Sequence, residues 1–360
     1  MSNLHRRACH GPFKARVDRY IEGSLPLTTG TLDESASSTP DHAAGAPRIG
    51  SVAEWPRISV VTPSYNQGAY IGETIRSVLE QDYPHVEYII TDGGSTDETV
   101  EVIRQYEDRI HYWVSEPDRG QTHAIAKGWQ QATGDIICWL NSDDWYYPGA
   151  LATVARTFVE NPGLRWLNGG VLNGYDADSI HHEHVPSNSS LAECLGRRKY
   201  GFHQPGMFWT PQLLEQAGPL DESLHFCFDH DLWCRALAAG IKPLRVPQPF
   251  TFFRLHRESK TCSQRIEFLR EDWVIFRRYQ DQLPPTERRQ AREWLRTYEA
   301  GYLVDVIYGQ LAGKGRLSAL ACLLKRLSLI RLSPDRRAVL GALARILGSG
   351  RCPSWWKSQL

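Results

Sequence analysis

Hydrophobic and polar positions alternate in blocks from Trp55 onward, and these blocks predict strands and helices in turn. The strand-like blocks are short and rich in Val and Ile, as in RISVVT at 57–62, which is typical of a strand buried on both faces. Between them, apolar residues recur at helical spacing, as at Ile71, Ile75 and Val78. This alternation predicts an α/β fold, with a mainly parallel sheet flanked by helices. The first four predicted strands span 57–62, 86–91, 110–115 and 136–140.

Each of these strands runs into a polar loop. The carboxyl ends of parallel strands meet at one edge of the sheet, and open α/β sheets bind their ligands outside that edge. We therefore expect the four loops to lie close together and to form a ligand site. They span 62–66, 92–97, 118–121 and 141–144.

The fourth loop carries two adjacent acids, Asp143 and Asp144, just after an apolar strand. Their oxygen atoms suit Mg²⁺ or Mn²⁺, although an isolated Asp-Asp pair is also common in turns and helix caps. The first loop, PSYNQG at 63–68, is neither G-x-G-x-x-G nor a P-loop. A diphosphate bound at this edge would need another neutralising group, and a metal ion at the acid pair can supply it.

Two acids compete for the role of general base in the FDHDLW stretch at 228–233. Asp231 has Arg235 four residues later, which favours an ion pair on a solvated helix flank. Asp229 follows three apolar or sulfur-containing residues at the start of a predicted helix, which suits a carboxylate beside a pocket. The same position also suits a simple helix N-cap. We expect this helix to run to about Ala239 and to be closed by Gly240.

The polar stretch 173–190 predicts a loop. It contains three histidines, at 181, 182 and 184, but without a distant fourth ligand they do not indicate a zinc site. Two further strands are predicted at 242–246 and 250–255, and His256 follows the second one. An imidazole there can complete a metal site, and it suits Mn²⁺ better than Mg²⁺.

Composition and charge narrow the class of protein. Lys+Arg and Asp+Glu balance at 41 each, so the total charge gives no reason to expect a nucleic-acid partner. The eight cysteines form neither a C-x-x-C pair nor a zinc spacing, which favours a reduced, cytoplasmic chain. No segment reaches the ~18 uninterrupted apolar residues of a membrane span.

The two ends of the chain differ from its centre. Residues 1–54 are rich in Ser, Thr, Ala, Gly and Pro, and this composition predicts a disordered arm. Residues 264–360 predict a helical C-terminal region. Its apolar stretches at 317–330 and 339–347 are interleaved with Lys and Arg, a pattern that suits peripheral contact with an anionic membrane. Packing of these helices on the main domain or on a second subunit is the alternative.

Six short stretches in order resemble a family 2 glycosyltransferase with the GT-A fold. The resemblance covers 57–263, and we take 55–263 as the catalytic domain. The stretches are TPSYNQ, DGGSTDET, SEPDRGQ, ATGDIICWLNSDD, FDHDLW and RLHRES.

This resemblance implies an inverting enzyme that uses a nucleotide-sugar donor and Mn²⁺ or Mg²⁺. It assigns Thr62, Tyr65 and Asp92 to the base and ribose. Asp143 then meets the nucleotide, while Asp144 and His256 hold the metal. Asp229 is the general base. Separately, Arg119 precedes a helix N-terminus that can bind a diphosphate. The alternative is that Arg119 forms a solvent-facing ion pair.

Three positions depart from the family pattern. Asn141 stands where the first acid of the D-x-D region is usual, and Gly93 replaces the second acid of the Asp-Asp-Gly-Ser turn. The latter change weakens the expectation of uridine. Phe228 replaces the Glu that often precedes the base, and a more hydrophobic surrounding would raise the pKa of Asp229.

The sequence therefore predicts a hexosyltransferase that moves a sugar, with UDP as the expected carrier, to a hydroxyl of a glycan or lipid-linked acceptor. Cell-surface polysaccharide synthesis is the expected context, and the expected location is cytoplasmic or at the cytoplasmic face of the membrane. The alternative is a catalytically silent scaffold or regulatory protein that binds nucleotide sugars.

Overall fold

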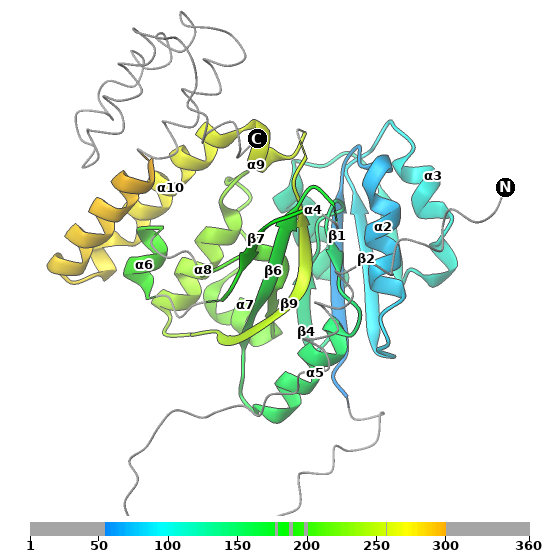
Figure 1. Cartoon of the computed structure of the whole chain (residues 1–360), viewed down its shortest axis with the longest axis horizontal. Coiled ribbons are helices and arrows are strands. Elements are labelled where there is room, and N and C mark those ends of the chain that lie inside the picture. The colour runs from blue at the N-terminus through cyan, green and yellow to red at the C-terminus, as the bar shows by residue number, and fades with distance from the viewer. Residues whose placement is uncertain (1–54, 177–178, 187–189, 198–200, 257, 300–360) are drawn as a thin grey trace, which may run out of the picture.

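The computed structural model describes residues 55–176, 179–186, 190–197, 201–256 and 258–299 (Figure 1). The N-terminal arm expected at 1–54 and the basic stretches at 317–330 and 339–347 lie outside the described residues. Within the described ranges, no helix has both the length and the hydrophobicity needed to span a bilayer.

The N-terminal half of the sheet is parallel, as its sequence pattern predicts. Its strands are β1 (Ile58–Ser64), β2 (Val86–Asp92), β3 (Tyr112–Ser115) and β4 (Ile136–Trp139). They lie in the order β3-β2-β1-β4, and each neighbouring pair is parallel. All seven residues of β1 are buried, because helices cover both faces of the strand.

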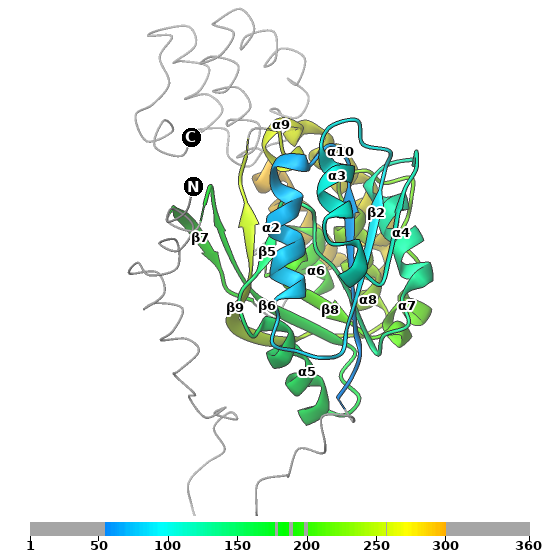
Figure 2. The ribbon, with the colours of Figure 1, turned by 90° about the vertical axis from the view of Figure 1, so that its right-hand side faces the viewer.

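The helices between these strands are α2 (Gly68–Leu79), α3 (Thr99–Arg104) and α4 (Gln121–Gln131), and a short 3₁₀ turn, η2 (Glu107–Arg109), follows α3. Figure 2 shows α2 and α4 on opposite sides of the strands. Gly128 lets α4 approach β1 closely, since a Cβ there would lie 2.4 Å from Cγ1 of Val61. The chain moves outward from β1 to β3 and then returns to β4 on the other side of β1. Ligands bind at such a reversal of strand order.

The second half of the sheet is mixed and joins β4 through an antiparallel strand. Its strands are β5 (Trp145–Tyr146), β6 (Trp166–Gly174), β7 (Ile180–His184), β8 (Met207–Trp209) and β9 (Leu244–Arg254). The order continues β4-β8-β6-β9-β5, with β6 and β9 parallel and the other pairs antiparallel. Helix α5 (Ala150–Glu160) connects β5 to β6.

Two expectations for this half are wrong. The stretch 173–190 is not a loop, because β6 continues to Gly174 and pairs antiparallel with β7. The hairpin was not predicted because its residues are mostly polar. It lies at the margin of the sheet, where a strand needs few apolar side chains. The two strands expected at 242–246 and 250–255 are one strand, β9, whose register with β6 shifts around Gly169 and Gly170. Pro249 pairs with Gly170 at this shift, so the prolines bend the strand without ending it.

The remaining helices are α6 (Leu191–Leu195), α7 (Pro211–Ala217), α8 (Phe228–Ala238), α9 (Lys260–Ser263) and α10 (Arg265–Tyr279), with 3₁₀ turns η3 (Gln204–Gly206) and η4 (Gln280–Gln282). Most of these helices lie on the side of the molecule away from α2 and α3, whereas α9 lies at the end of β9 (Figure 1). Residues 285–299 are also helical. Helix α8 packs against α6, α7 and α10. It ends at Ala238, and Gly240, with a φ of +78°, closes it as predicted.

Aromatic side chains join α8 to the sheet. Trp139 of β4 stacks on Trp209 of β8 with ring centroids 5.0 Å apart, and Phe228 of α8 lies 6.0 Å from Trp139. All three side chains are buried. The start of α8 is therefore fixed against the strand that leads into the acid pair.

Candidate active site

Asp143 and His256 meet at the carboxyl edge of the sheet. Oδ2 of Asp143 lies 2.9 Å from Nε2 of His256. The antiparallel pairing of β5 and β9 brings them together, since Trp145 pairs with Phe252 and the rings of these two residues stack 3.9 Å apart. Figure 1 shows β9 running toward this edge, where α9 follows it.

This pair has the donors that a divalent metal needs. The side chain of Asp143 is 19% exposed and that of His256 is 9% exposed, so both lie at the base of an accessible surface. Nδ1 of His256 is buried and has no hydrogen-bond partner among the residues that the structure describes, and the ring packs 4.6 Å from Tyr70. The carboxylate of Asp143 and the Nε2 atom that faces it are an oxygen and a nitrogen donor, a combination that fits Mn²⁺.

Asp144 lies deeper than its neighbour. It is fully buried, its Oδ1 accepts the backbone N–H of Arg254 at 3.0 Å, and its Oδ2 accepts Nδ2 of Asn141 at 3.2 Å. Burial, together with the charge of Asp143, raises the pKa of Asp144 well above the ordinary value. The sequence analysis assigned the metal to Asp144. In the structure, Asp143 lies next to His256, whereas both carboxylate oxygens of Asp144 accept hydrogen bonds from the protein.

Asn141 is the centre of a network of amides. Besides Asp144, its Nδ2 donates to Oε1 of Gln204 at 3.1 Å, and its Oδ1 accepts from Nε2 of Gln121 at 2.8 Å. Gln204 in turn donates to the carbonyl of Trp139 at 2.7 Å. Only an amide both donates and accepts in this way. The departure from the family pattern at this position thus has a structural role.

Arg254 is a site residue that the sequence analysis missed. Its Nε donates to the carbonyl of Asp143 at 3.0 Å, and its guanidinium forms an ion pair with Glu73. The guanidinium carbon lies 4.6 Å from the ring centre of Trp145 and 5.1 Å from that of Tyr70. Residues two apart along a strand share a face, so the R-x-H pattern of RLHRES could have indicated it.

The side chains predicted to meet the base and ribose are placed differently from one another. Tyr65 is 60% exposed, just beyond β1. Thr62 is fully buried, and its hydroxyl receives a hydrogen bond from the Tyr88 hydroxyl at 3.1 Å. Of Thr62 and Tyr65, only Tyr65 therefore has an accessible side chain.

Asp92 organises the turn after β2. Its Oδ2 accepts the backbone N–H of Gly94 at 3.1 Å and of Ser95 at 2.8 Å, and it also accepts the Ser115 hydroxyl at 2.7 Å. The carboxylate is fully buried. Gly94 has a φ of +83°, which favours glycine at this turn. The buried carboxylate of Asp92 therefore holds the turn after β2 and the end of β3 in place.

Arg119 forms the solvent-facing ion pair that its sequence context left open. Its side chain is 68% exposed and pairs with Glu222. The structure does not bring it to Asp143 or His256 through any described contact.

Lys260 is a second site residue that the sequence analysis missed. Its Nζ donates to Oε1 of Gln121 at 3.1 Å and to the carbonyl of His225 at 3.2 Å. Burial lowers the pKa of Lys260, against the charges of Glu271 and Asp118. Because Gln121 also bonds Asn141, this lysine links the acid-pair loop to the segment that precedes α8.

Asp229 occupies the first turn of α8 and is partly exposed. Burial raises the pKa of its carboxyl to about 6, although the charge of Arg197 opposes this. The pKa of Asp229 is therefore raised, as we expected from Phe228 at the preceding position. A carboxyl with this pKa is ionised at neutral pH and still basic enough to accept a proton.

The expectation that Asp231 lies on a solvated flank is wrong. Its side chain is 1% exposed and accepts Nε of Arg235 at 2.8 Å and the Tyr279 hydroxyl at 2.8 Å. The Arg235 pair at i+4 was correctly anticipated, but Tyr279 lies on α10, which the local sequence could not place over it. Asp231 is thus committed to the interface of α8 and α10, while Asp229 remains available.

Glu271 of α10 holds the segment that enters α8. Its carboxylate accepts the backbone N–H groups of His225 at 2.8 Å, Phe226 at 2.9 Å and Cys227 at 2.7 Å. These three residues are the N-cap of α8, Cys227, and the two residues before it. The position of Asp229 therefore depends on α10.

The fold and this edge define an α/β protein of the GT-A class, with a carboxylate–imidazole pair at the reversal of strand order. The sequence profile described as Glycosyl transferase family 2 matches residues 59–192. A Bacillus subtilis protein named "Putative teichuronic acid biosynthesis glycosyltransferase TuaG" is 45% identical over 233 residues, which cover 62% of this chain and 88% of TuaG. The chain belongs to glycosyltransferase family 2 and is a glycosyltransferase.

Other relatives agree with this assignment. The uncharacterized glycosyltransferase Rv1514c of Mycobacterium tuberculosis is 39% identical over 184 residues, which cover 50% of this chain and 69% of that protein. The mannosyltransferase PcManGT from Pyrobaculum calidifontis, solved with GDP-Man and Mn²⁺, has a TM-score of 0.54 at 18% identity and covers 94% of each chain. Residues 1–349 of TarS from S. aureus give a TM-score of 0.51 at 16% identity, covering 81% of this chain and 88% of that one. At these identities, the two structures support the fold alone.

Proposed function

We propose that this glycosyltransferase is metal-dependent and inverting, and that it moves a sugar from a UDP-linked donor to a hydroxyl of a glycan or lipid-linked acceptor. The observation that carries the proposal is the contact of Asp143 with His256 at the reversal of strand order. A nucleotide diphosphate at this edge needs positive charge, and the first loop supplies no phosphate-binding glycine motif. A metal ion on this pair supplies that charge. The Mn²⁺ in PcManGT, which shares the fold, is in keeping with this choice.

The donor would lie between the first loop and the acid pair. Tyr65 offers an exposed ring on which a nucleobase can stack, and Asp143 and His256 would hold the ion that bridges to the diphosphate. When bound, that ion neutralises charge on the departing nucleoside diphosphate. Arg254 holds the loop in place by donating to the Asp143 carbonyl. Asp144 acts as the buried support of the pair.

Asp229 would activate the acceptor. Its ionised carboxylate accepts the proton of the acceptor hydroxyl as the oxygen attacks the anomeric carbon of the donor sugar. A single displacement of this kind inverts the anomeric configuration. Burial keeps the pKa of Asp229 near 6, so the group is a stronger base than an exposed aspartate. The three backbone contacts to Glu271 hold the segment that carries it.

The proposed acceptor class is supported by a sequence relative rather than by the site. The name of TuaG places that protein in teichuronic acid biosynthesis, and this chain would likewise act in cell-surface polysaccharide synthesis. A lipid-linked acceptor would be presented at a membrane surface, and the protein would then act at the cytoplasmic face of the membrane.

A donor screen tests this proposal. The purified chain is given UDP-, GDP- and dTDP-sugars with Mn²⁺ or with a chelator, and release of the nucleotide is followed with and without short glycan acceptors. We expect turnover with one nucleotide class, lost on chelation, and an inverted product by proton NMR. Asp229→Asn should abolish transfer, whereas the exposed Glu267→Gln serves as the matched control. Nucleotide-sugar binding without any turnover would instead establish the scaffold alternative.

A further inference from the structure

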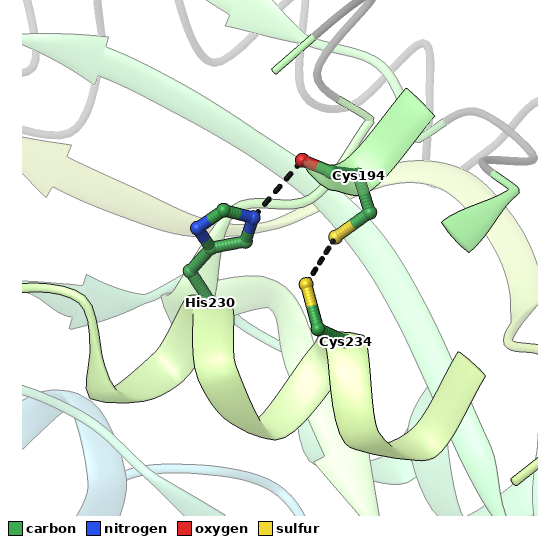
Figure 3. Close-up of side chains that lie close together, drawn as sticks. All are labelled: Cys194, His230 and Cys234. Atoms are coloured by element: carbon green, nitrogen blue, oxygen red, sulfur yellow. Dashed lines mark hydrogen bonds between the residues drawn. The ribbon is translucent and has the colours of Figure 1, made fainter. Parts of the chain in front are cut away.

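Two cysteine sulfurs meet on the side of α8 that faces α6 (Figure 3). Sγ of Cys194 on α6 lies 3.5 Å from Sγ of Cys234 on α8, and both are free thiols. They are 1% and 0% exposed, respectively. Neither residue belongs to the site described above. A disulfide requires a separation of about 2.05 Å, so a displacement of about 1.5 Å would join them.

A buried histidine sets the charge of this pair. Nδ1 of His230 lies 2.9 Å from Oδ1 of Asp272, and its Nε2 lies 2.9 Å from the carbonyl oxygen of Cys194. Both ring nitrogens face oxygen acceptors, so the ring carries two protons and a positive charge. Burial and Arg197 oppose that charge, but Cys194 and Asp272 raise the pKa of His230 to about 9.

The same surroundings make Cys194 the more acidic thiol. Burial alone would raise its pKa, but the hydrogen bond from Cys234 and the charge of His230 lower it to about 6. The pKa of Cys234 is raised well above the ordinary value by burial and by its bond to Cys194. The pair thus joins a thiolate to a thiol, the combination from which oxidation to a disulfide proceeds.

A soft metal ion is the competing occupant. Single ligand atoms of Cys194, His230 and Cys234 lie within 4.8 Å of one another, and thiolates with imidazole suit Zn²⁺. A metal needs a nitrogen lone pair, however, and both nitrogens of His230 are engaged with oxygen acceptors. The hydrogen bonds therefore favour redox chemistry over metal binding.

We propose that Cys194 and Cys234 are a redox pair that hydrogen peroxide closes into a disulfide, which ties α6 to the helix carrying Asp229. The thiolate of Cys194 attacks one peroxide oxygen, the O–O bond breaks, and hydroxide leaves to give a sulfenic acid. The sulfur of Cys234 then attacks the Cys194 sulfur, the S–O bond breaks, and the hydroxyl leaves with the Cys234 proton as water. Two thiols are oxidised and one peroxide is reduced to two waters.

Closure would alter catalysis through α8. Asp229 lies five residues before Cys234 on this helix, and drawing the sulfurs together moves the helix toward α6. A shift of about 1 Å in a reacting group can lower a rate about 100-fold. This consequence rests on the proposed role of Asp229, whereas disulfide formation does not.

The first test is peptide mapping of the full chain. Reduced protein is treated with peroxide, blocked with an alkylating reagent under denaturing conditions and digested. We expect a Cys194–Cys234 cross-linked peptide, lost in Cys194→Ser. In Cys234→Ser, Cys194 should instead react with dimedone as a sulfenic acid. Cys227→Ser is the matched control, since Cys227 is also buried beside Asp272, and it should keep the cross-link.

The remaining outcomes separate the claims. Absence of the Cys194–Cys234 peptide in the oxidised protein would overturn the proposal, as would one zinc per chain in the purified protein that is lost in Cys194→Ser. For the oxidised protein we expect at least about a 10-fold lower kcat with an unchanged nucleotide Kd, restored by dithiothreitol. An unchanged kcat beside a formed cross-link would overturn the catalytic consequence. A reduced protein without any transferase activity would overturn the proposed function, and the mapping result would stand.

Discussion

Oδ2 of Asp143 and Nε2 of His256 lie 2.9 Å apart although 113 residues separate them in the chain. The contact exists because β5, two residues long, pairs antiparallel with the end of β9. One residue comes from the loop after β4 and the other from the end of the sheet's longest strand. A ligand that contacts both side chains therefore depends on the pairing of β5 with β9.

The first prediction concerns metal affinity. Asp143→Asn and His256→Gln should each weaken Mn²⁺-dependent nucleotide binding by at least about 10-fold, because each removes one donor from the pair. The double variant should lose little more than either single one, since both act on one ion. Titration calorimetry measures this, and additive losses would mean that the two residues act separately.

Asp144 provides the comparison for that pair. Asp144→Asn keeps the shape of the side chain but changes a buried carboxylate that accepts from Asn141 and from the Arg254 backbone. We expect Asp144→Asn mainly to lower the free energy of unfolding, by about 1–3 kcal/mol. Its effect on Mn²⁺ affinity should be smaller than that of Asp143→Asn. Chemical denaturation measures the first quantity. If Asp144→Asn lost more metal affinity than Asp143→Asn, Asp144 would be the metal ligand.

The second prediction concerns pH. Asp229 must be ionised to act as a base, and burial raises its pKa to about 6. The rate of transfer should therefore rise as pH increases through about 6 and level off above it. Asp229→Asn should lower kcat by about 100-fold or more and should remove this limb of the profile while leaving the nucleotide Kd unchanged. A limb that persists in the variant would assign the titration to another group.

The third prediction concerns the support of α8. Glu271→Ala removes the acceptor of three backbone N–H groups at the entry to the helix. We expect kcat to fall with an unchanged nucleotide Kd, together with a loss of about 1–3 kcal/mol in unfolding free energy. Glu267→Ala is the control on the same helix, because its carboxylate forms an exposed pair with Arg270. Equal effects of the two variants would remove the positioning role from Glu271.

The fourth prediction concerns the departure at Asn141. Asn141→Asp restores the family's usual acid but replaces an amide that donates to Asp144 and to Gln204. Two carboxylates would then face each other, and the Gln204 carbonyl would lose its donor. We expect a loss of about 1–3 kcal/mol in unfolding free energy and no gain in Mn²⁺ affinity. Tighter metal binding would show that this position belongs to the metal site.

The parallel half of the fold follows from the sequence because its signals are local. Runs of Val and Ile set the strands, helical spacing sets α2 and α4, and polar loops mark the edge that holds Asp143. What the sequence could not supply depends on partners far along the chain. Asp231 was misplaced because Tyr279 covers it from α10, and β7 was missed because its residues are mostly polar. The family resemblance placed Thr62 at the base and ribose, but β1 is covered on both faces, and the Thr62 hydroxyl is buried against Tyr88.

The most direct test of the account is isothermal titration of the purified chain with UDP, GDP and dTDP, each with Mn²⁺ and with a chelator. The account predicts that one nucleotide, expected to be UDP, binds only with the metal and that Asp143→Asn removes this binding. Binding of no diphosphate under either condition, or equal binding with and without Mn²⁺, would contradict a metal and nucleotide site at Asp143 and His256.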